Sequence, residues 1–241
     1  MAVDVSMKVR LEKYLADMGF GTRSQVKQQI ARGSVTVNGS SAVRPELKIE
    51  TDSDTVFYCG VKAAYEPYEY FMLNKPAGVV SATEDKKERT VLDLLQERKR
   101  KDLFPVGRLD KDTEGLLLIT NDGNLAHRLL APGKHVDKVY YAEIDGKVTR
   151  EDAEHFLAGV DIGDEKKTMP AVLEILSSAD RSRVLLTIRE GRFHQVKRMF
   201  HAAGKEVLFL KRIQMGSLKL DEKLSPGEYR RLTKEEVEKL C

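Results

Sequence analysis

Hydrophobic residues recur at helical spacing near the start of the chain. Residues 8–18 place apolar side chains three and four positions apart, and Gly19 follows as a stop, which predicts a first helix. A second helix is expected to begin at Thr22, because Thr22 and Gln25 have the spacing of a capping box, and to end at Gly33. The chain is therefore predicted to open with two short helices.

Alternating strands are expected after these helices. The segment SVTVNG (34–39) alternates apolar and polar residues and ends in Asn38-Gly39, a pair typical of a two-residue hairpin turn. Short strands are predicted to continue to about residue 60, beyond which the periodicity is lost. We therefore expect a small N-terminal domain, a linker and a larger C-terminal domain, at residues 8–60, 61–68 and 69–241.

From Tyr70 onward, strand and helix patterns are mixed without strict alternation. Strands are expected at 70–76, 78–83, 115–120, 139–146, 171–176 and 183–190. Helices are expected at 90–95, 124–130, 150–160, 194–204 and 234–240. The basic run Arg98–Lys101 is predicted to be exposed. The fold class is therefore α+β, with a mainly antiparallel mixed sheet and flanking helices in the larger domain.

Composition is typical of a soluble globular protein. Apolar residues make up 41% of the 241 residues and charged residues 33%. No apolar run approaches the roughly 18 residues of a membrane span, and the N-terminus lacks the apolar core of a signal peptide. Two cysteines are too few for a disulfide framework or a metal cluster. We expect a protein of the reducing cytoplasm with no membrane contact.

Positive charge is concentrated in two segments, although the net charge is only +3. Lys8–Arg44 holds seven Lys or Arg residues against two acids, and Arg189–Arg212 holds seven against two. Such segments favour a polyanionic partner whose phosphates they neutralise. Two solvated faces remain an alternative interpretation.

Acidic residues cluster in VGRLDKDTEGLLLIT (106–120). The run DKDTEG imitates the start of a calcium loop, but Asn121 stands where the closing carboxylate belongs. Asp110 and Asp112 also permit a paired-carboxylate glycosidase, although the clustered aromatic residues of a sugar site are missing. A third interpretation makes both residues simple turn formers before a strand.

The same segment resembles the signature of the pseudouridine synthases, in GRLD and in D-x-x-x-x-G-L-L-L. Further matches follow in the family's order: YFMLNKPAG (70–78), HRLLAP (127–132), KVYYAEI (138–144), MPAVLEIL (169–176), EGRFHQVKRMFHAAG (190–204) and LSPGEYRRLTKEE (224–236). They resemble the RsuA-type branch, which acts on ribosomal RNA and carries an N-terminal S4 domain. Residues 8–60, with G-x-V-x-V-N-G, are similar to that S4 domain, which implies binding of structured RNA.

The resemblance implies a cofactor-free isomerisation of uridine. It makes Asp110 the catalytic carboxylate, Lys197 the cation that favours its ionised form, and Tyr140 the ring that stacks on uracil and assists proton transfer from C5. Whether Asp110 attacks C1′ or removes a ribose proton stays open. Arg108 is expected to hold the substrate backbone or replace the flipped base. Arg192, His194 and Gln195 are expected to position RNA or the active-site loop. Arg23, Lys27 and Arg32, on the second helix, are further candidates for RNA contact.

The target implied by the resemblance is a uridine of small-subunit (16S) rRNA. The partner is then ribosomal RNA or a pre-ribosomal small-subunit particle, and the protein is expected to be a monomer. No metal is expected, because His194 and His201 lack the i, i+4 spacing of a zinc site. Two alternatives remain: a large-subunit (23S) rRNA synthase of the same branch, and a non-catalytic S4-type RNA-binding protein of ribosome assembly.

Overall fold

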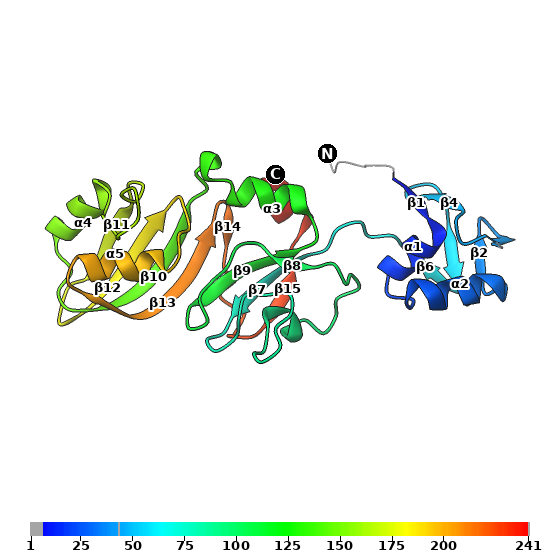
Figure 1. Cartoon of the computed structure of the whole chain (residues 1–241), viewed down its shortest axis with the longest axis horizontal. Helices are drawn as coiled ribbons and strands as arrows, with labels where there is room; N and C mark the ends of the chain where they lie inside the picture. Colours follow the sequence, from blue (N-terminus) through cyan, green and yellow to red (C-terminus); the bar gives the residue numbers. More distant parts are fainter. Residues whose placement is uncertain (1–6, 43, 241) are drawn as a thin grey trace. The chain divides into compact units, whose positions relative to one another are not determined.

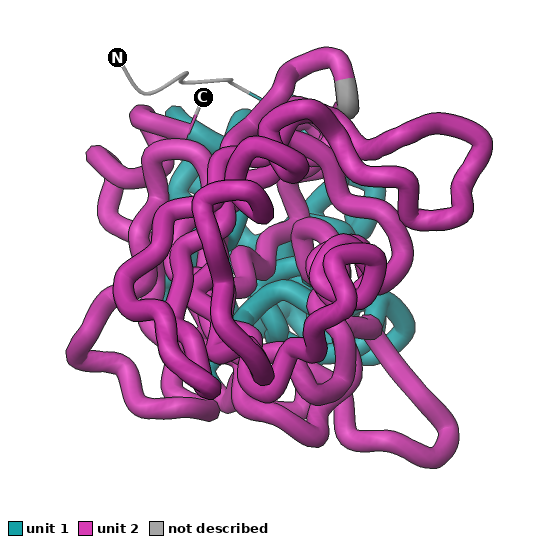
Figure 2. Tube along the Cα trace, turned by 90° about the vertical axis from the view of Figure 1, so that its left-hand side faces the viewer, with its two compact units in different colours: residues 1–69, 97–103 teal, residues 70–96, 104–241 magenta. Residues whose placement is uncertain are grey.

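The computed structural model describes residues 7–42 and 44–240; Cys241, one of the two cysteines, lies outside them. The chain divides into two compact units, which Figure 2 colours separately. Among the described residues, unit 1 comprises 7–69 with 97–103, and unit 2 comprises 70–96 with 104–240. Each unit has its own hydrophobic cluster.

Unit 1 combines two helices with short strands (Figure 1). The helices are α1 (Leu11–Asp17) and α2 (Arg23–Ala31). The strands are β1 (Lys8–Arg10), β2 (Val35–Val37), β3 (Ser40–Ser41), β4 (Lys48–Glu50), β5 (Val56–Tyr58) and β6 (Val61–Ala63). They form a sheet in the order β3-β2-β5-β6 and a separate pair β1-β4. Residues 8–10, predicted as helix, are a strand because Val9 is buried opposite Ile49 of β4.

Two local signals of unit 1, the capping box and the Asn-Gly turn, are confirmed. The hydroxyl of Thr22 accepts a hydrogen bond from the Gln25 amide at 3.3 Å, and the Thr22 amide donates to Oε1 of Gln25 at 2.8 Å, which is the predicted capping box. The turn between β2 and β3 places Asn38 at φ 51° and Gly39 at φ 80°. Both values lie in the left-handed region that an Asn-Gly hairpin turn requires.

Residues 97–103 pack with unit 1, and the expected exposure of the run Arg98–Lys101 is wrong at Arg100. Its side chain is buried, with Nη1 3.2 Å from Asp17 and Nη2 2.7 Å from Asp102. The amides of Lys99 and Arg100 also donate to the buried carboxylate of Glu69. A guanidinium can be withdrawn from water here because two carboxylates replace its hydration.

Unit 2 is built on a sheet of nine strands among the described residues. The strands are β7 (Tyr70–Lys75), β8 (Phe104–Pro105), β9 (Glu114–Thr120), β10 (Lys138–Asp145), β11 (Val172–Ser177), β12 (Arg181–Ile188), β13 (Glu206–Met215), β14 (Leu218–Lys219) and β15 (Tyr229–Arg231). Their order is β11-β12-β10-β13-β9-β7-β15, with β14 beside β13 and β8 beside β9. All pairs are antiparallel except β9–β13. The predicted α+β class with a mainly antiparallel mixed sheet is confirmed.

Helices flank this sheet (Figure 1). They are η1 (Val91–Leu94), α3 (Gly123–Leu130), η2 (Pro132–Lys134), α4 (Arg150–Leu157), α5 (Gln195–Ala202) and α6 (Lys234–Leu240). The strand expected at 78–83 is absent: Val80 makes a single bridge with Thr90, and the hydroxyl of Ser81 bonds the backbone of Leu109 instead. None of the described helices is both long and apolar enough to cross a membrane.

The parallel junction between β9 and β13 depends on Gly115. It has φ 98° and lies opposite Arg212, and a Cβ atom there would lie 2.2 Å from the Arg212 carbonyl oxygen. Only glycine permits this approach. The strand order is β12-β10-β13-β9 in this part of the sheet. The junction therefore brings the loop that precedes β9, which carries Asp110, close to β10 and β12.

Candidate active site

The loop that carries Asp110 connects β8 to β9 and is fixed from below by Lys75, the last residue of β7. The Lys75 side chain is fully buried, and the three N–H groups of its Nζ are shared among four backbone carbonyls: Pro76 (3.1 Å), Asp110 (3.0 Å), Lys111 (3.1 Å) and Thr113 (2.8 Å). Burial lowers the pKa of Lys75 to about 8, against the smaller opposing effect of nearby carboxylates. The ammonium group of Lys75 thus fixes the backbone conformation of the loop that carries Asp110.

Ser81 fixes the same loop one residue earlier. Its buried hydroxyl donates to the carbonyl of Leu109 at 2.8 Å and accepts from the Leu109 amide at 3.1 Å. The Thr113 amide donates to the Asp110 carbonyl at 3.1 Å and closes the turn. The backbone at Asp110 is therefore held by other residues, and the Asp110 carboxylate remains available to contact a ligand.

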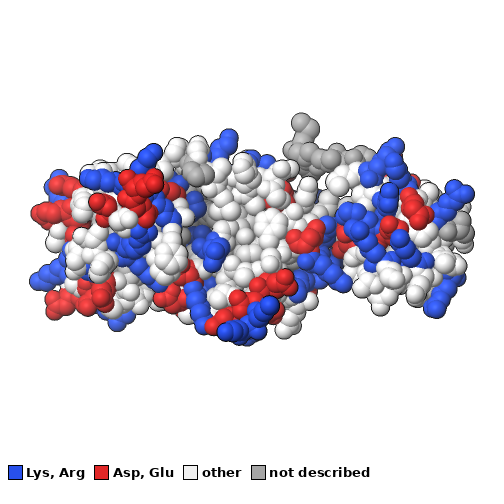
Figure 3. Space-filling model, in the orientation of Figure 1, with Lys and Arg blue, Asp and Glu red and all other residues white. Residues whose placement is uncertain are grey.

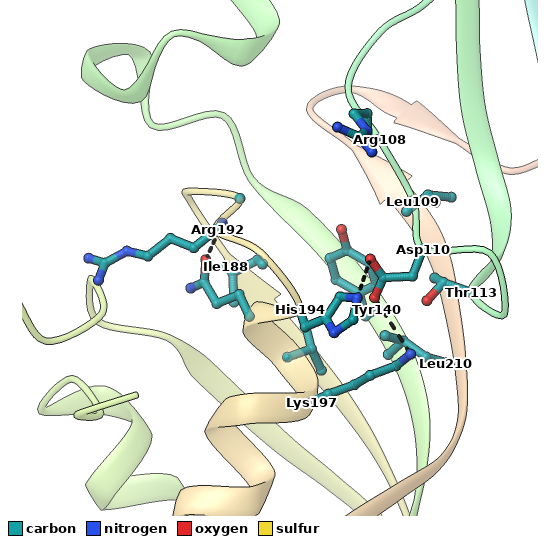
Figure 4. A pocket seen from close by; sticks show the side chains of 13 residues that line it. Arg108, Leu109, Asp110, Thr113, Tyr140, Ile188, Arg192, His194, Lys197 and Leu210 are labelled. Carbon is teal, nitrogen blue, oxygen red and sulfur yellow. Dashed lines mark hydrogen bonds and ion pairs between the residues drawn. The ribbon is translucent and has the colours of Figure 1, made fainter. Parts of the chain in front are cut away.

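The Asp110 carboxylate faces two nitrogen groups from the start of α5 (Figure 4). Oδ2 lies 3.6 Å from Nζ of Lys197, and Oδ1 lies 3.6 Å from Nε2 of His194. The side chain is 27% exposed, so it is accessible from solvent. The predicted aspartate and lysine, 87 positions apart in sequence, thus meet in space.

Lys197 also contacts the second aspartate of the loop. Its Nζ lies 2.6 Å and 2.8 Å from the two carboxylate oxygens of Asp112. This hydrogen bond is the main reason that the pKa of Asp112 lies below its usual value. Asp112 therefore holds the ammonium of Lys197 beside Asp110 from the solvent side.

Helix α5 turns Lys197 toward the pocket because its other face is anchored. Val196, Met199 and Phe200 are buried at helical spacing. The Phe200 ring lies edge-on to Phe156 of α4, with ring centroids 5.0 Å apart. Packing on this face leaves Lys197 at the side of the helix that borders Asp110.

Tyr140 reaches the pocket from β10. Its side chain is 8% exposed and lines the pocket with Asp110 and Lys197. A β-bulge opposite the Val139/Tyr140 step interrupts the pairing with β13, a feature common beside active sites. Tyr141 points to the other face, where it donates to Glu143 and meets the edge of Phe209, so Tyr140 is the one of these two tyrosines that lines the pocket.

The pocket combines residues from five segments (Figure 4). They are Arg108, Leu109, Asp110, Thr113, Tyr140, Ile188, Gly191, Arg192, His194, Gln195, Val196, Lys197 and Leu210. Arg108 is exposed at the rim, and no described residue forms a hydrogen bond or ion pair with it. Its guanidinium is thus available for a contact with substrate.

Arg192 and Gln195 lie at the pocket but are engaged within the protein. The Gln195 side chain is buried, donates to Glu190 at 3.0 Å and accepts from the Arg192 amide at 3.0 Å. The Arg192 guanidinium donates to Glu190 and to the carbonyls of Lys166 (2.6 Å) and Lys167 (2.8 Å). These contacts shape the loop between β12 and α5.

The candidate residues of the second helix lie in unit 1. Arg23, Lys27 and Arg32 are all exposed, on α2 and at its C-terminal cap. Lys27 lies 3.5 Å from the carboxylate of Glu12 on α1. Elsewhere, the described part of the chain contains no group of three His, Cys, Asp or Glu side chains arranged for a metal ion.

Two family models match segments of this chain. A family model described as RNA pseudouridylate synthase matches residues 69–202, and one described as S4 domain matches residues 9–56. The chain belongs to the pseudouridine synthase family. The expected RNA-modifying isomerase with an N-terminal S4 domain is thereby confirmed.

Full-length relatives support the assignment to this family. The RNA pseudouridine synthase YtzG of Bacillus subtilis (strain 168) is 48% identical over 231 residues, which cover 95% of this chain and 97% of the relative. Ribosomal small subunit pseudouridine synthase A of Escherichia coli (strain K12) is 41% identical over 230 residues, covering 95% and 98%. A crystal structure of a pseudouridylate synthase, 37% identical, matches with a TM-score of 0.69 and covers 97% of this chain and 100% of that chain.

Sequence reasoning missed the residues that support the site. Lys75 was included in a motif but given no role, and Ser81 was placed in a strand. A signal for Lys75 did exist, since it is the only charged residue in the apolar strand YFMLNK. Ser81 has no comparable signal, because its partner Leu109 is distant in sequence.

Proposed function

We propose that this pseudouridine synthase isomerises a uridine of small-subunit (16S) rRNA, with Asp110 as the catalytic carboxylate. The observation that carries the proposal is the Asp110 carboxylate, which is accessible in a pocket and 3.6 Å from the Lys197 ammonium. The rRNA target is supported by the 41% identity to a relative named for the ribosomal small subunit and by the S4 domain.

The proposed reaction balances within the nucleotide. The bond between N1 of uracil and C1′ of ribose breaks, the base turns, and a bond between C5 and C1′ forms. The proton on C5 is lost and N1 gains one, so neither an oxidant nor a co-reactant is consumed. An ionised carboxylate next to the ribose serves either route, attack on C1′ or removal of a ribose proton.

Each of the neighbouring residues has a distinct proposed part. Lys197 supplies a positive charge 3.6 Å from the Asp110 carboxylate, which orients this carboxylate by Coulombic attraction. Tyr140 offers a ring face in the pocket wall on which the flipped uracil can stack. Arg108, which pairs with no described residue, is proposed to hold the RNA backbone or to replace the flipped base, and Arg23, Lys27 and Arg32 are proposed to contact phosphates through the S4 domain.

Asp110→Asn tests the proposal. The substituted side chain keeps its shape but loses its charge, so we expect product formation on transcribed 16S rRNA to fall by about a thousand-fold or more. Asp145→Asn, an exposed residue at the end of β10, is the matched control and should keep wild-type activity. A wild-type rate for Asp110→Asn would remove Asp110 from the mechanism.

The target is tested separately by mapping pseudouridines in both rRNAs from cells that lack the protein. We expect one site to be lost from 16S rRNA and restored by the wild-type gene but not by Asp110→Asn. Loss of a 23S site would move the target to the large subunit and leave the role of Asp110 intact. An unchanged map in both rRNAs would contradict the rRNA target altogether.

A further inference from the structure

One aromatic side chain beside the pocket, Phe193, is largely exposed to solvent. Phe193 is 75% exposed, the highest value among the exposed large hydrophobic residues of the described chain. It lies in the loop between β12 and α5, directly before His194, which lines the pocket and faces Asp110. A phenyl ring that is 75% exposed contributes little burial energy to folding and keeps apolar surface available for a ligand.

The Phe193 ring is held in a defined orientation by His194. The two rings are stacked, with centroids 3.8 Å apart and planes at 17°. His194 has a left-handed backbone conformation, with φ 48° and ψ 33°. This conformation is unfavourable for a residue with a side chain and persists only where surrounding contacts impose it.

Those contacts come from the loop itself. The buried amide of Gln195 ties the loop to Glu190, and Nη1 of Arg198 donates to the Phe193 carbonyl at 3.2 Å. The backbone that carries Phe193 is therefore fixed before any ligand arrives. A fixed ring loses little conformational entropy when something stacks on it.

Charge near Phe193 is already compensated. Lys197 is paired with Asp112, while Arg192 and Arg198 are both paired with Asp164. Figure 3 shows the same interleaving of acidic and basic side chains around α4 and α5 on the visible face of unit 2. A ligand that reaches the pocket beside Phe193 therefore meets an exposed aromatic ring, whereas the neighbouring cations are already paired with carboxylates.

We propose that the Phe193 ring, backed by His194, is a stacking platform for a nucleobase adjacent to the target uridine. Flipping a uridine into the pocket unstacks its neighbours, and an exposed aromatic ring next to the pocket can take up one of them. The proposal rests on the proposed function, because it assumes an RNA whose uridine enters the Asp110 pocket. It adds a second base-binding position outside that pocket.

Fluorescence can test this contact directly, because the chain contains no tryptophan. Phe193→Trp, combined with Asp110→Asn to prevent turnover, places a single indole at the platform. Titration with an RNA fragment that contains the mapped target uridine should quench this indole as a base stacks on it. Leu157→Trp in the same background puts an indole at another exposed position, on α4, and should show little quenching.

Replacing the flanking nucleotides by abasic ones identifies the base. We expect an abasic nucleotide on one side of the uridine to abolish the quenching and one on the other side to leave it. Quenching that survives both replacements, or tight binding with no quenching at all, would overturn the proposal.

Substitutions at 193 separate stacking from general apolar contact. Phe193→Ala should weaken RNA binding by about five- to one-hundred-fold, the range expected for one stacked base. Phe193→Tyr should retain wild-type affinity, whereas Phe193→Leu, apolar but without a ring, should resemble Phe193→Ala. Because the side chain is exposed, all variants should melt at the wild-type temperature.

Three outcomes assign a failure to one proposal or the other. The stacking proposal would be contradicted, and the proposed function left intact, if the wild type forms product but RNA does not quench the indole. The same conclusion would follow if the wild type forms product and Phe193→Leu binds RNA with full affinity. A defect of Phe193→Ala that appears on ribosomal particles but not on naked RNA would assign Phe193 to a protein contact instead. Quenching by RNA in a protein whose wild-type form makes no pseudouridine would contradict the proposed function and leave Phe193 only as a residue on which an RNA base stacks.

Discussion

The two sides of the Asp110 pocket are held in place by opposite means. On one side, the loop that carries Asp110 is held from the interior by Lys75 and Ser81, through hydrogen bonds to backbone atoms. On the other side, the loop before α5 is held by ion pairs and hydrogen bonds of the partly exposed Arg192 side chain, together with hydrogen bonds of the buried Gln195 side chain. The first arrangement couples the site to the stability of the whole unit, whereas the second can be altered locally.

This difference has a simple physical origin. A buried donor that is removed leaves its acceptors without water, so the cost is large and affects folding. A partly exposed guanidinium that is removed leaves partners that water can solvate again, so folding changes little. Substitutions on the two sides should therefore separate stability from activity.

Lys75→Met should have the largest effect on stability. Its loss leaves the Pro76 and Thr113 carbonyls without the donor that they share, and we expect the free energy of unfolding to fall by about 2–4 kcal/mol. Activity should fall as well, because the Asp110 backbone is released. Urea unfolding measures the first effect and product formation the second; Lys86→Met, in an exposed loop, is the control.

The pH dependence of the unfolding free energy, compared between the wild type and Lys75→Met, tests whether the buried Lys75 ammonium is the cause of this effect. The pKa of Lys75 is about 8 in the folded protein and 10.5 in the unfolded chain, so between these values the unfolded state binds more protons. The unfolding free energy of the wild type should therefore rise relative to Lys75→Met as the pH increases from 8 to 10.5. A constant difference over that range would mean that burial does not lower the pKa of Lys75 in the folded protein.

Arg192→Lys should affect activity more than stability. A lysine cannot span Glu190 and the carbonyls of Lys166 and Lys167 together, so the loop that carries His194 loosens. We expect kcat to fall about ten-fold while the unfolding free energy changes by less than about 1 kcal/mol. If only KM rises and kcat is unchanged, Arg192 acts instead as an RNA contact.

Asp112→Asn should give the smallest effect. It removes the strongest partner of Lys197 but leaves Asp110 and the buried supports unchanged, so we expect kcat to fall a few-fold with no measurable change in melting temperature at neutral pH. Asp112→Glu should recover part of the loss because it keeps a carboxylate near Lys197. A wild-type rate for Asp112→Asn would show that Lys197 needs no second carboxylate.

Much of the local structure was predictable. The capping box at Thr22, the turn at Asn38-Gly39 and helix α6 appear as expected, because each depends on residues close in sequence. The same reasoning failed where distant partners decide: Val9 is drawn into a strand by Ile49, and Arg100 is buried by Asp17. The choice of Asp110, Tyr140 and Lys197 came from a resemblance, since periodicity alone would leave all three as ordinary residues.

The sequence by itself determined the class of fold, the family and the short elements, because these follow from periodicity, turn chemistry and motifs within a few residues of each other. Only the tertiary structure decided that Asp110 and Lys197 lie 3.6 Å apart, that Lys75 is buried beneath them and that Phe193 is exposed beside them. These facts depend on the order of strands in the sheet, and on the close approach of β9 to β13 at Gly115. Contacts between such distant residues are set by packing of the whole unit, which no local pattern encodes.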